Sequence, residues 1–246
     1  MLHRVPRRVS RARRAVRAAA YVWLAGVGAG HAQEIAGARF TDPTERYGHA
    51  ILGDAIEWGG LEITLGDGTT RQFTLPQDHV FEDVAPRLAD LDGDGRPEVM
   101  VVETDVTKGG AFAIYGPTGK ITETPHIGTR NRWLAPLGAA DIDGDGITEI
   151  AYIDRPHLAK VLRIWRYENG TLTQGADLAG FTNHRIGEAD IAGGIRTCNG
   201  TPEMILATAN WRTLVALRWT GSTFLQADLG SDTSRPAFNR AMTCAN

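Results

Sequence analysis

Strand-like segments that recur along the chain predict an all-β fold, a β-propeller of about four four-stranded antiparallel blades. Similar apolar segments begin at residues 61, 111, 161 and 214, which gives a repeat of about fifty residues. Turn sequences rich in Gly, Asn and Asp follow each segment, as in β-hairpins, and outer strands such as 72–75 and 224–228 come next. Four antiparallel strands in about fifty residues match the size of one propeller blade.

The repeats cover about residues 48–87, 88–138, 139–187 and 188–246, all within a single domain of residues 33–246. In the first repeat, residues 50–53 correspond to the strand at 99–102, and an innermost strand is missing. A spare segment, 236–244, remains at the far end of the chain. We therefore expect the C-terminal strand to complete the first blade, because ring closure removes exposed sheet edges. An open arc or one completed by a dimer partner is the alternative.

Two acidic loops, DLDGDGRPE at residues 90–98 and DIDGDGITE at 141–149, share one pattern. Each places three carboxylates at alternate positions, then Gly, then a closing Glu. Calcium takes several oxygen ligands in an irregular cage, so the pattern predicts two calcium sites. We expect the ligands of the first site to be Asp90, Asp92, Asp94, Glu98 and the carbonyl of Arg96. Those of the second are Asp141, Asp143, Asp145, Glu149 and the carbonyl of Ile147.

The alternative interpretation is that these loops are ordinary Asp-Gly turns, since Asp and Gly dominate turns. Two copies in register, each followed by an apolar strand, favour metal binding. An EF-hand fits less well because its loop has about twelve residues and lies between helices. A third counterpart begins at Asp190 but has Ala192 and Gly194 in place of carboxylates, so no calcium is predicted there.

Residues 1–32 have the composition of a secretory signal peptide. They hold seven Arg and no acidic residue, followed by an apolar run and small residues before Ala32, where we expect cleavage. The apolar run is too short to span a bilayer, and an organelle transit peptide is the minority interpretation. Loss of the seven Arg would change the formal net charge from −3 to −10. An acidic exported domain argues against nucleic acid as a partner, and we expect a periplasmic or extracellular location.

Cysteine usage is consistent with export. Cys198 and Cys244 are the two cysteines of the chain, and an even pair in an oxidising compartment predicts a disulfide. Two buried free thiols are the alternative. The predicted bond would tie a loop of the fourth repeat to the C-terminal segment.

The acidic loops followed by apolar strands resemble the FG-GAP/VCBS repeat family, which is related to the integrin α-subunit propellers. The resemblance covers residues 85–115 and 136–167 well, and the other two repeats by strand pattern only. It implies calcium-stabilised blades in an exported protein and often an interaction role. It does not by itself imply catalysis.

The loops at the opposite end of the blades collect charged and aromatic residues, which is where a partner would bind on a rigid scaffold. The candidate ligand face consists of Arg132, Trp133, Asp154, Arg155, His157, His184, Arg185, Trp211 and Arg212. The alternative is that these residues are solvated charges and packing aromatics. His184 paired with Asp154 or Glu82 would be an acid–base pair.

These observations predict a non-enzymatic, exported, calcium-binding propeller that binds an unknown protein or glycan, with calcium in a structural role. No transmembrane segment is expected in the mature chain. The alternatives are a hydrolase-like enzyme that uses the polar end of the axis, and a scaffold subunit of an envelope assembly. The sequence contains no nucleophile elbow, zinc-spaced His/Cys set or phosphate loop.

Overall fold

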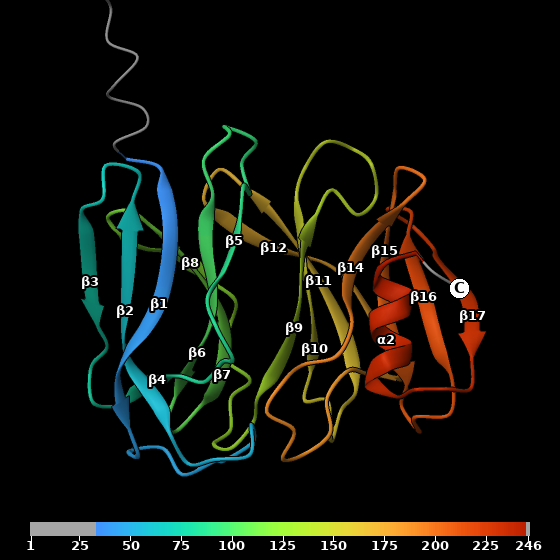
Figure 1. Ribbon diagram of the computed structural model, residues 1–246, viewed down its shortest axis with the longest axis horizontal. Coiled ribbons are helices and arrows are strands. Elements are labelled where there is room, and N and C mark those ends of the chain that lie inside the picture. Colours follow the sequence, from blue (N-terminus) through green and yellow to red (C-terminus); the bar gives the residue numbers. More distant parts are fainter. Residues whose placement is uncertain (1–32, 245–246) are drawn as a thin grey trace, which may run out of the picture.

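Antiparallel strands form most of residues 33–244, the part of the chain that this computed structural model describes. The expected signal peptide at residues 1–32 lies outside these residues. The strands run roughly perpendicular to the long axis of the molecule and sort into four groups that follow one another along that axis (Figure 1). The prediction of an all-β fold is confirmed.

The first group contains β1 (Ile35–Thr44), β2 (Glu57–Leu65) and β3 (Thr70–Thr74). The second contains β5 (Arg87–Ala89), β6 (Glu98–Asp105), β7 (Gly109–Gly116) and β8 (Gly119–Glu123). The third contains β9 (Leu134–Ala140), β10 (Glu149–Asp154), β11 (Val161–Glu168) and β12 (Thr171–Ala179). The fourth contains β14 (Gly194–Cys198), β15 (Thr201–Thr208), β16 (Leu214–Trp219) and β17 (Phe224–Gly230). The short strands β4 (His79–Phe81) and β13 (Phe181–Thr182) pair beside these groups, and β4 joins the first two into one sheet.

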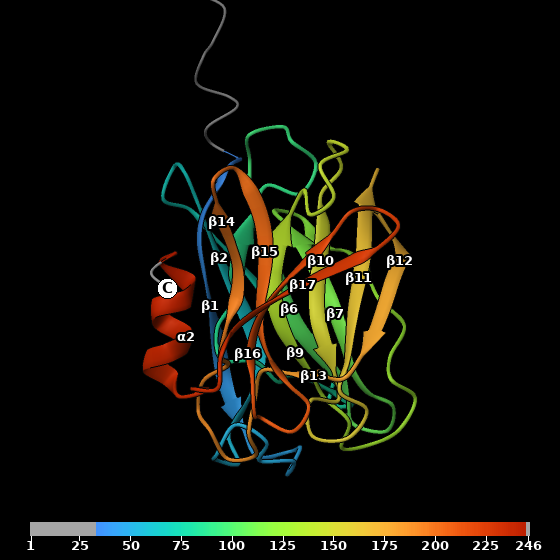
Figure 2. The same cartoon turned by 90° about the vertical axis from the view of Figure 1, so that its right-hand side faces the viewer.

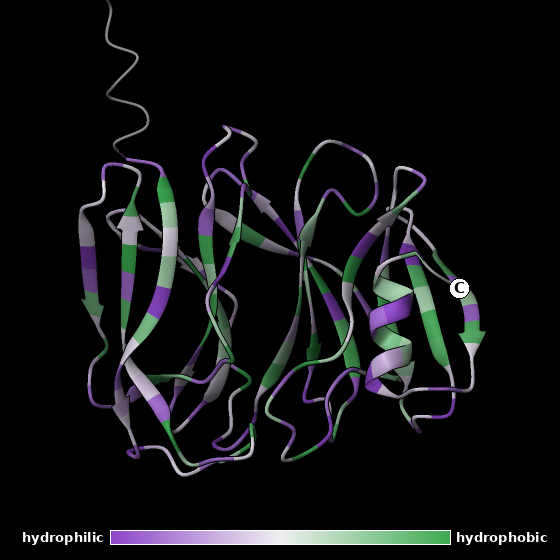
Figure 3. Ribbon diagram, viewed as in Figure 1, coloured by the Kyte–Doolittle hydropathy of each residue, from purple (hydrophilic) through white to green (hydrophobic). Residues whose placement is uncertain are grey.

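The alternation of side chains along each strand explains how the groups stack. In β6, Val99 and Val101 pack towards the first group, whereas Met100 and Val102 pack towards the third. Successive side chains of a strand point to opposite faces, so a strand that is apolar on both faces must lie between two layers. The hydrophobic core is therefore a series of clusters between successive groups. Figure 3 shows hydrophobic residues along the strands and hydrophilic ones in the loops at both ends.

The two ends of this row of sheets are finished in different ways. The outer side of the first group is polar: Arg39 forms an ion pair with Glu62 at 2.8 Å, and Gln72 donates a hydrogen bond to Thr41 at 2.5 Å. The outer side of the fourth group is apolar and is covered by the helix α2 (Arg235–Met242). Figure 2 shows α2 lying alongside β14. Neither end therefore presents an uncovered apolar layer.

The predicted closing strand is wrong, because residues 235–242 form α2. Ser234 caps the helix, accepting a hydrogen bond from the Ala237 amide, and Ala237, Phe238 and Ala241 are buried against the fourth group. Buried positions at i, i+1 and i+4 are typical of one face of a helix. Instead of completing the first group, the C-terminal segment lies at the opposite end of the row (Figure 1).

The first group also differs from the expectation. Residues 50–53, which were expected to form a strand, are a turn, and β1 supplies the strand that pairs with β2, so the group begins ahead of residue 48. Residues 45–56, which we call the strap, instead run across the lower end of the molecule in Figure 1. The strap reaches the connection that leads into the fourth group, where the amide of Gly187 donates a hydrogen bond to the Ile51 carbonyl at 3.2 Å. No helix within residues 33–244 is long and apolar enough to cross a membrane.

Candidate functional site

The two acidic loops have the same backbone fold. The first Asp of each loop accepts hydrogen bonds from two amides of its own loop. For Asp90 the donors are three and five residues ahead at 2.8 and 2.9 Å, and for Asp141 the distances are 2.8 and 3.0 Å. The two glycines of each loop have φ between 75° and 89°, a conformation that only Gly adopts without strain. The motif therefore specifies a tight turn with its carboxylates drawn inward.

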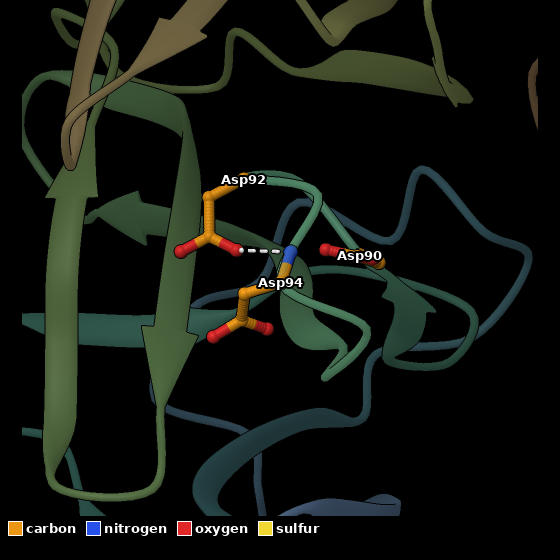
Figure 4. Close-up of side chains that lie close together, drawn as sticks. All are labelled: Asp90, Asp92 and Asp94. Atoms are coloured by element: carbon orange, nitrogen blue, oxygen red, sulfur yellow. Dashed lines mark hydrogen bonds between the residues drawn. The ribbon is translucent and has the colours of Figure 1, made fainter.

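Each loop gathers three of its predicted carboxylate ligands within 4.8 Å of one another, but the sets differ. The first loop brings together Asp90, Asp92 and Asp94, all exposed. Figure 4 shows these side chains around the turn, with the Asp94 amide donating to Asp92. The second loop brings together Asp141, Asp143 and the buried Glu149. Clustered carboxylate oxygens are the donors that calcium prefers, so both loops can hold this ion.

The closing Glu distinguishes the loops most clearly. Glu98 is half-buried, whereas Glu149 is only 1% exposed. In each case one oxygen accepts a backbone amide, Leu91 to Glu98 at 3.0 Å and Ile142 to Glu149 at 2.9 Å. The second oxygen of Glu149, Oε1, is buried without a hydrogen bond. A buried carboxylate oxygen without a donor is destabilising, and a cation at the Asp141–Asp143 cluster would satisfy it.

Burial also changes the acidity of these groups. It raises the pKa of Glu98, and it raises the pKa of Glu149 to about 7, with the charges of Asp143 and Asp145 acting in the same direction. The cause is the loss of hydration of the charged form. Without an ion, the carboxyl of Glu149 is therefore only partly ionised at neutral pH.

Each loop has one arginine partner, and the two arginines come from different places. Arg96 lies within the first loop and pairs with Asp94, its Nε donating to Oδ2 at 2.8 Å. Arg166 comes from β11, opposite Glu149 in the strand register. Its guanidinium lies 2.6 Å from Asp145 and 3.5 Å from both Asp143 and Glu149. The second loop therefore has a cation from a neighbouring strand among its predicted ligands.

The third counterpart has no such acidic cluster. Within residues 33–244, the structure gathers acidic groups suited to a metal only at the first two loops. Asp190 forms an ion pair with Arg235 at 2.9 Å, and Glu203 pairs with Arg196 at 2.7 Å. A disulfide joins Cys198 at the end of β14 to Cys244 after α2, with 6.0 Å between the Cα atoms. It fastens the helix to the fourth group.

The segment that contains both acidic loops can now be compared with known families. Residues 90–152 match the profile of the FG-GAP-like repeat. This segment is therefore similar to the FG-GAP-like repeat. It begins at Asp90 and ends within β10, so it includes both clusters and the strands between them.

Comparisons over the whole chain add less. No curated protein matches the sequence. Among solved structures, the exotype rhamnogalacturonan lyase YesX is similar over 77% of this chain and 44% of its own chain, with 16% sequence identity and a TM-score of 0.48. The chain thus spans less than half the length of that lyase.

The predicted ligand face lies at the end of the strands away from the acidic loops of the FG-GAP-like repeat, and the structure brings part of it together. Arg132, Trp133, Arg155 and His157 line one pocket. His184 is buried beneath it, with its ring 5.0 Å from Trp133 and its Nδ1 3.0 Å from His157 Nε2. These five residues form a contiguous set.

The remaining predicted residues have other contacts. The guanidinium of Arg185 lies 3.7 Å above the Trp211 ring, which packs against Phe238. Arg212 is exposed. Arg185 and Trp211 therefore help to hold the loops and α2 together.

Asp154 serves the scaffold rather than the pocket. It is buried and ion-paired with Arg155 at 2.7 Å and Arg163 at 2.8 Å. Against its burial, the hydrogen bonds from these guanidiniums hold the pKa of Asp154 below its ordinary value. The expected pairing of His184 with Asp154 or Glu82 is wrong. His184 instead contacts His157 and the Glu188 carbonyl, and Glu82 accepts from His49 at 2.5 Å.

The strap supplies residues that the sequence did not point to. His49 and Ile51 line the same pocket, and the Tyr47 hydroxyl accepts a hydrogen bond from the Asn131 amide at 2.8 Å. The alignment of residues 50–53 with the strand at 99–102 does not predict that His49 and Ile51 contribute to this face. The signal that could have revealed it is the polar and aromatic sequence of residues 45–49, which is poor for a strand.

Proposed function

We propose that the protein is an exported, calcium-binding module of the β-propeller type, in which calcium stabilises the fold and the opposite end binds a protein or glycan. The four groups of strands correspond to four blades in this proposal. The FG-GAP-like repeat and the all-β architecture support a propeller-type interaction module. The sequence has no nucleophile elbow, zinc-spaced His/Cys set or phosphate loop that would support catalysis.

The observation that carries the calcium proposal is the environment of Glu149. Its Oε1 is buried without a hydrogen bond beside Asp141 and Asp143, and its ion pair with Arg166 is long, at 3.5 Å. Calcium bound there would supply a closer partner for this oxygen and would neutralise the repulsion among the three carboxylates. An ion that binds the folded state alone stabilises it by mass action, about 2.7 kcal/mol at a hundred times its dissociation constant.

Export is supported by the disulfide, since such bonds persist in oxidising compartments. The Arg-rich, acid-free start of the sequence followed by an apolar run agrees with it. Periplasmic or extracellular fluid also contains the calcium that the acidic loops would bind.

We propose a binding role for the opposite end rather than catalysis. Burial lowers the pKa of His157 to about 4, and burial also lowers the pKa of His184. A general base is most effective when its pKa is near the working pH, so these imidazoles are poor bases at neutral pH. The enzyme alternative would have to use His49, which lines the same pocket and contacts Glu82 at 2.5 Å.

Chelation tests the calcium proposal. Protein shown by elemental analysis to contain calcium should melt at a lower temperature in excess chelator, and added calcium should restore the melting temperature. The Asp90→Ala, Asp141→Ala double variant should melt at a temperature that does not depend on calcium. An unchanged melting temperature after calcium is shown to be removed would contradict the proposal.

A further inference from the structure

The pocket at the strap has a volume of about 340 Å³ and is built from four separate loops. The strap contributes His49 and Ile51, and the connections between strands contribute the rest. The lining residues are His49, Ile51, Asn131, Arg132, Trp133, Arg155, Pro156, His157, Leu158 and Ile186. Ligand pockets in proteins start at about 300 Å³, so this one suits a small molecule.

The inner walls of the pocket are fixed. Trp133 is 2% exposed, and its indole Nε1 donates a hydrogen bond to the Glu82 carbonyl at 2.8 Å. The strap is held by the hydrogen bond that the Ile51 carbonyl accepts from the Gly187 amide and by the contact between His49 and Glu82. A pocket whose walls are already ordered loses little conformational entropy when a ligand binds.

The mouth of the pocket is apolar and exposed. Leu158 is 63% exposed and Ile186 is 72% exposed, the two largest values among the exposed large hydrophobic side chains of residues 33–244. Covering apolar surface is favourable by about 25 cal/mol per Å². A ligand with an aliphatic part would therefore be stabilised at this mouth.

The charged groups that line the pocket are all basic. No carboxylate lines it, although the chain as a whole has a net charge of −3. Arg155 is neutralised by Asp154 and His49 contacts Glu82. Arg132 donates to the Asn131 carbonyl at 2.8 Å and has no ion-pair partner in the described part of the chain. The pocket therefore presents one uncompensated guanidinium, which is suited to a carboxylate.

The two histidines define a hydrogen-bond acceptor in the same pocket. The Glu188 carbonyl can only accept, so His184 Nε2 must carry the proton of their 2.8 Å hydrogen bond. Neutral His184 then accepts at Nδ1, and His157 Nε2 must donate to it. His157 is left with an unprotonated Nδ1. A ligand hydroxyl can donate to this nitrogen.

We infer that the pocket binds a small aliphatic hydroxycarboxylate, with the carboxylate on Arg132, the hydroxyl on His157 and the carbon chain against Trp133, Ile51 and Leu158. This inference rests on the proposed binding role of this end of the molecule and does not require calcium. It adds to the proposed protein or glycan partner a small-molecule ligand of the same end, with one negative charge, one hydroxyl and a short apolar chain.

The test compares three probes of equal chain length by calorimetry: 2-hydroxy-4-methylpentanoate, 4-methylpentanoate and 2-hydroxy-4-methylpentanamide. We expect the hydroxy acid to bind about tenfold more tightly than the amide, since a hydrogen bond to a charged group contributes about 1.5 kcal/mol or more. It should bind a few-fold more tightly than the acid without the hydroxyl, since a hydrogen bond between neutral groups contributes about 1 kcal/mol. Equal affinity for all three, or no binding of the hydroxy acid up to millimolar concentration, would overturn the inference.

Two variants locate the binding and one controls for charge. Arg132→Gln should weaken both carboxylates about tenfold and leave the amide unchanged. His157→Phe should remove the preference for the hydroxyl. Arg130→Gln, an exposed neighbour that does not line the pocket, should bind like the unaltered protein. If Arg130→Gln weakens binding as much as Arg132→Gln, the attraction is general and the assignment to the pocket fails.

Each titration is repeated in calcium and in chelator, so that the two proposals fail separately. Calcium-dependent melting with no probe bound overturns the pocket inference alone. Probe binding with calcium-independent melting leaves the pocket inference standing and overturns the calcium proposal. Binding of a protein or glycan at this end while the hydroxy acid fails would also overturn the pocket inference.

Discussion

The loops at residues 90–98 and 141–149 have one backbone and two electrostatic environments. The two loops share the backbone conformation of their glycines, the position of their first Asp and the backbone amide that donates to the closing Glu. The facing strand is not, because Arg166 lies opposite Glu149 whereas the register of β6 with β7 places Gly116 at the corresponding position. The motif therefore determines the turn, and the neighbouring strand determines how strongly the turn needs an ion.

The largest expected difference between the loops is in their response to loss of the first Asp. Asp141→Asn should reduce the calcium-dependent part of the free energy of unfolding by about 2–3 kcal/mol, because the ion there would be the partner of a buried carboxylate. Asp90→Asn should reduce it by about 1 kcal/mol or less, since the clustered carboxylates of the first loop are exposed and hydrated. Urea unfolding in millimolar calcium measures both.

The first Asp of each loop accepts one amide on each carboxylate oxygen, so asparagine keeps one of these hydrogen bonds and loses the other, to the same extent in both loops. In chelator the two variants should therefore unfold at similar urea concentrations. A larger calcium-dependent loss for Asp90→Asn than for Asp141→Asn would show that burial of the closing Glu does not decide the strength of the site.

The closing Glu should produce the next largest difference, as a dependence on pH. In the calcium-free protein the pKa of Glu149 is raised from 4.5 to about 7, so folding favours its protonated form. Its contribution to stability is present below pH 4.5 and is lost as the pH rises through 7. Glu149→Gln should remove this loss, and should stabilise the calcium-free protein at pH 8 by about 2 kcal/mol.

Glu98→Gln is the matched control. Burial raises the pKa of Glu98 as well, but Glu98 is half-buried whereas Glu149 is almost fully buried, so the same change should have a smaller effect on the pH profile. In saturating calcium the order reverses, because Glu149→Gln removes a ligand from the stronger site. A calcium-free pH profile that is identical in Glu149→Gln and the unaltered protein would contradict this account.

How well the sequence predicts each feature depends on how far apart in the sequence the interacting residues lie. Strand periodicity and turn chemistry are local, and they predicted the all-β fold and the acidic turns. Whether residues 236–244 form a strand or a helix depends on the surface that they meet, and the apolar outer side of the fourth group favours α2. The ring closure inferred from a missing strand therefore failed.

The candidate sites show the same difference between local and long-range interactions. The carboxylates of each loop are near one another in sequence, and the two cysteines can pair only with each other within the chain. Sequence pattern alone therefore predicts both groupings. Arg166 could not be assigned to the second loop without the strand register, and His49 could not be placed beside Glu82 without the path of the strap. Residues of the ligand face that were grouped by topology separate into those that line the pocket and those that hold α2.

The arginine partners should produce the smallest and most diagnostic difference. Arg166 is close to three predicted ligands, so Arg166→Gln should destabilise the calcium-free protein by about 1 kcal/mol, because repulsion among those carboxylates is then unopposed. The same change should raise calcium affinity by a few-fold, since the guanidinium no longer competes with the ion.

Arg96→Gln removes an exposed pair within the first loop, and such pairs contribute about 0–1 kcal/mol, so its effect should be near the lower limit. Calcium titrations of the two variants, followed by calorimetry and by urea unfolding in chelator, measure both quantities. If Arg96→Gln and Arg166→Gln change calcium affinity equally, the facing strand does not tune the second loop, and the difference between the loops lies in the burial of Glu149 alone.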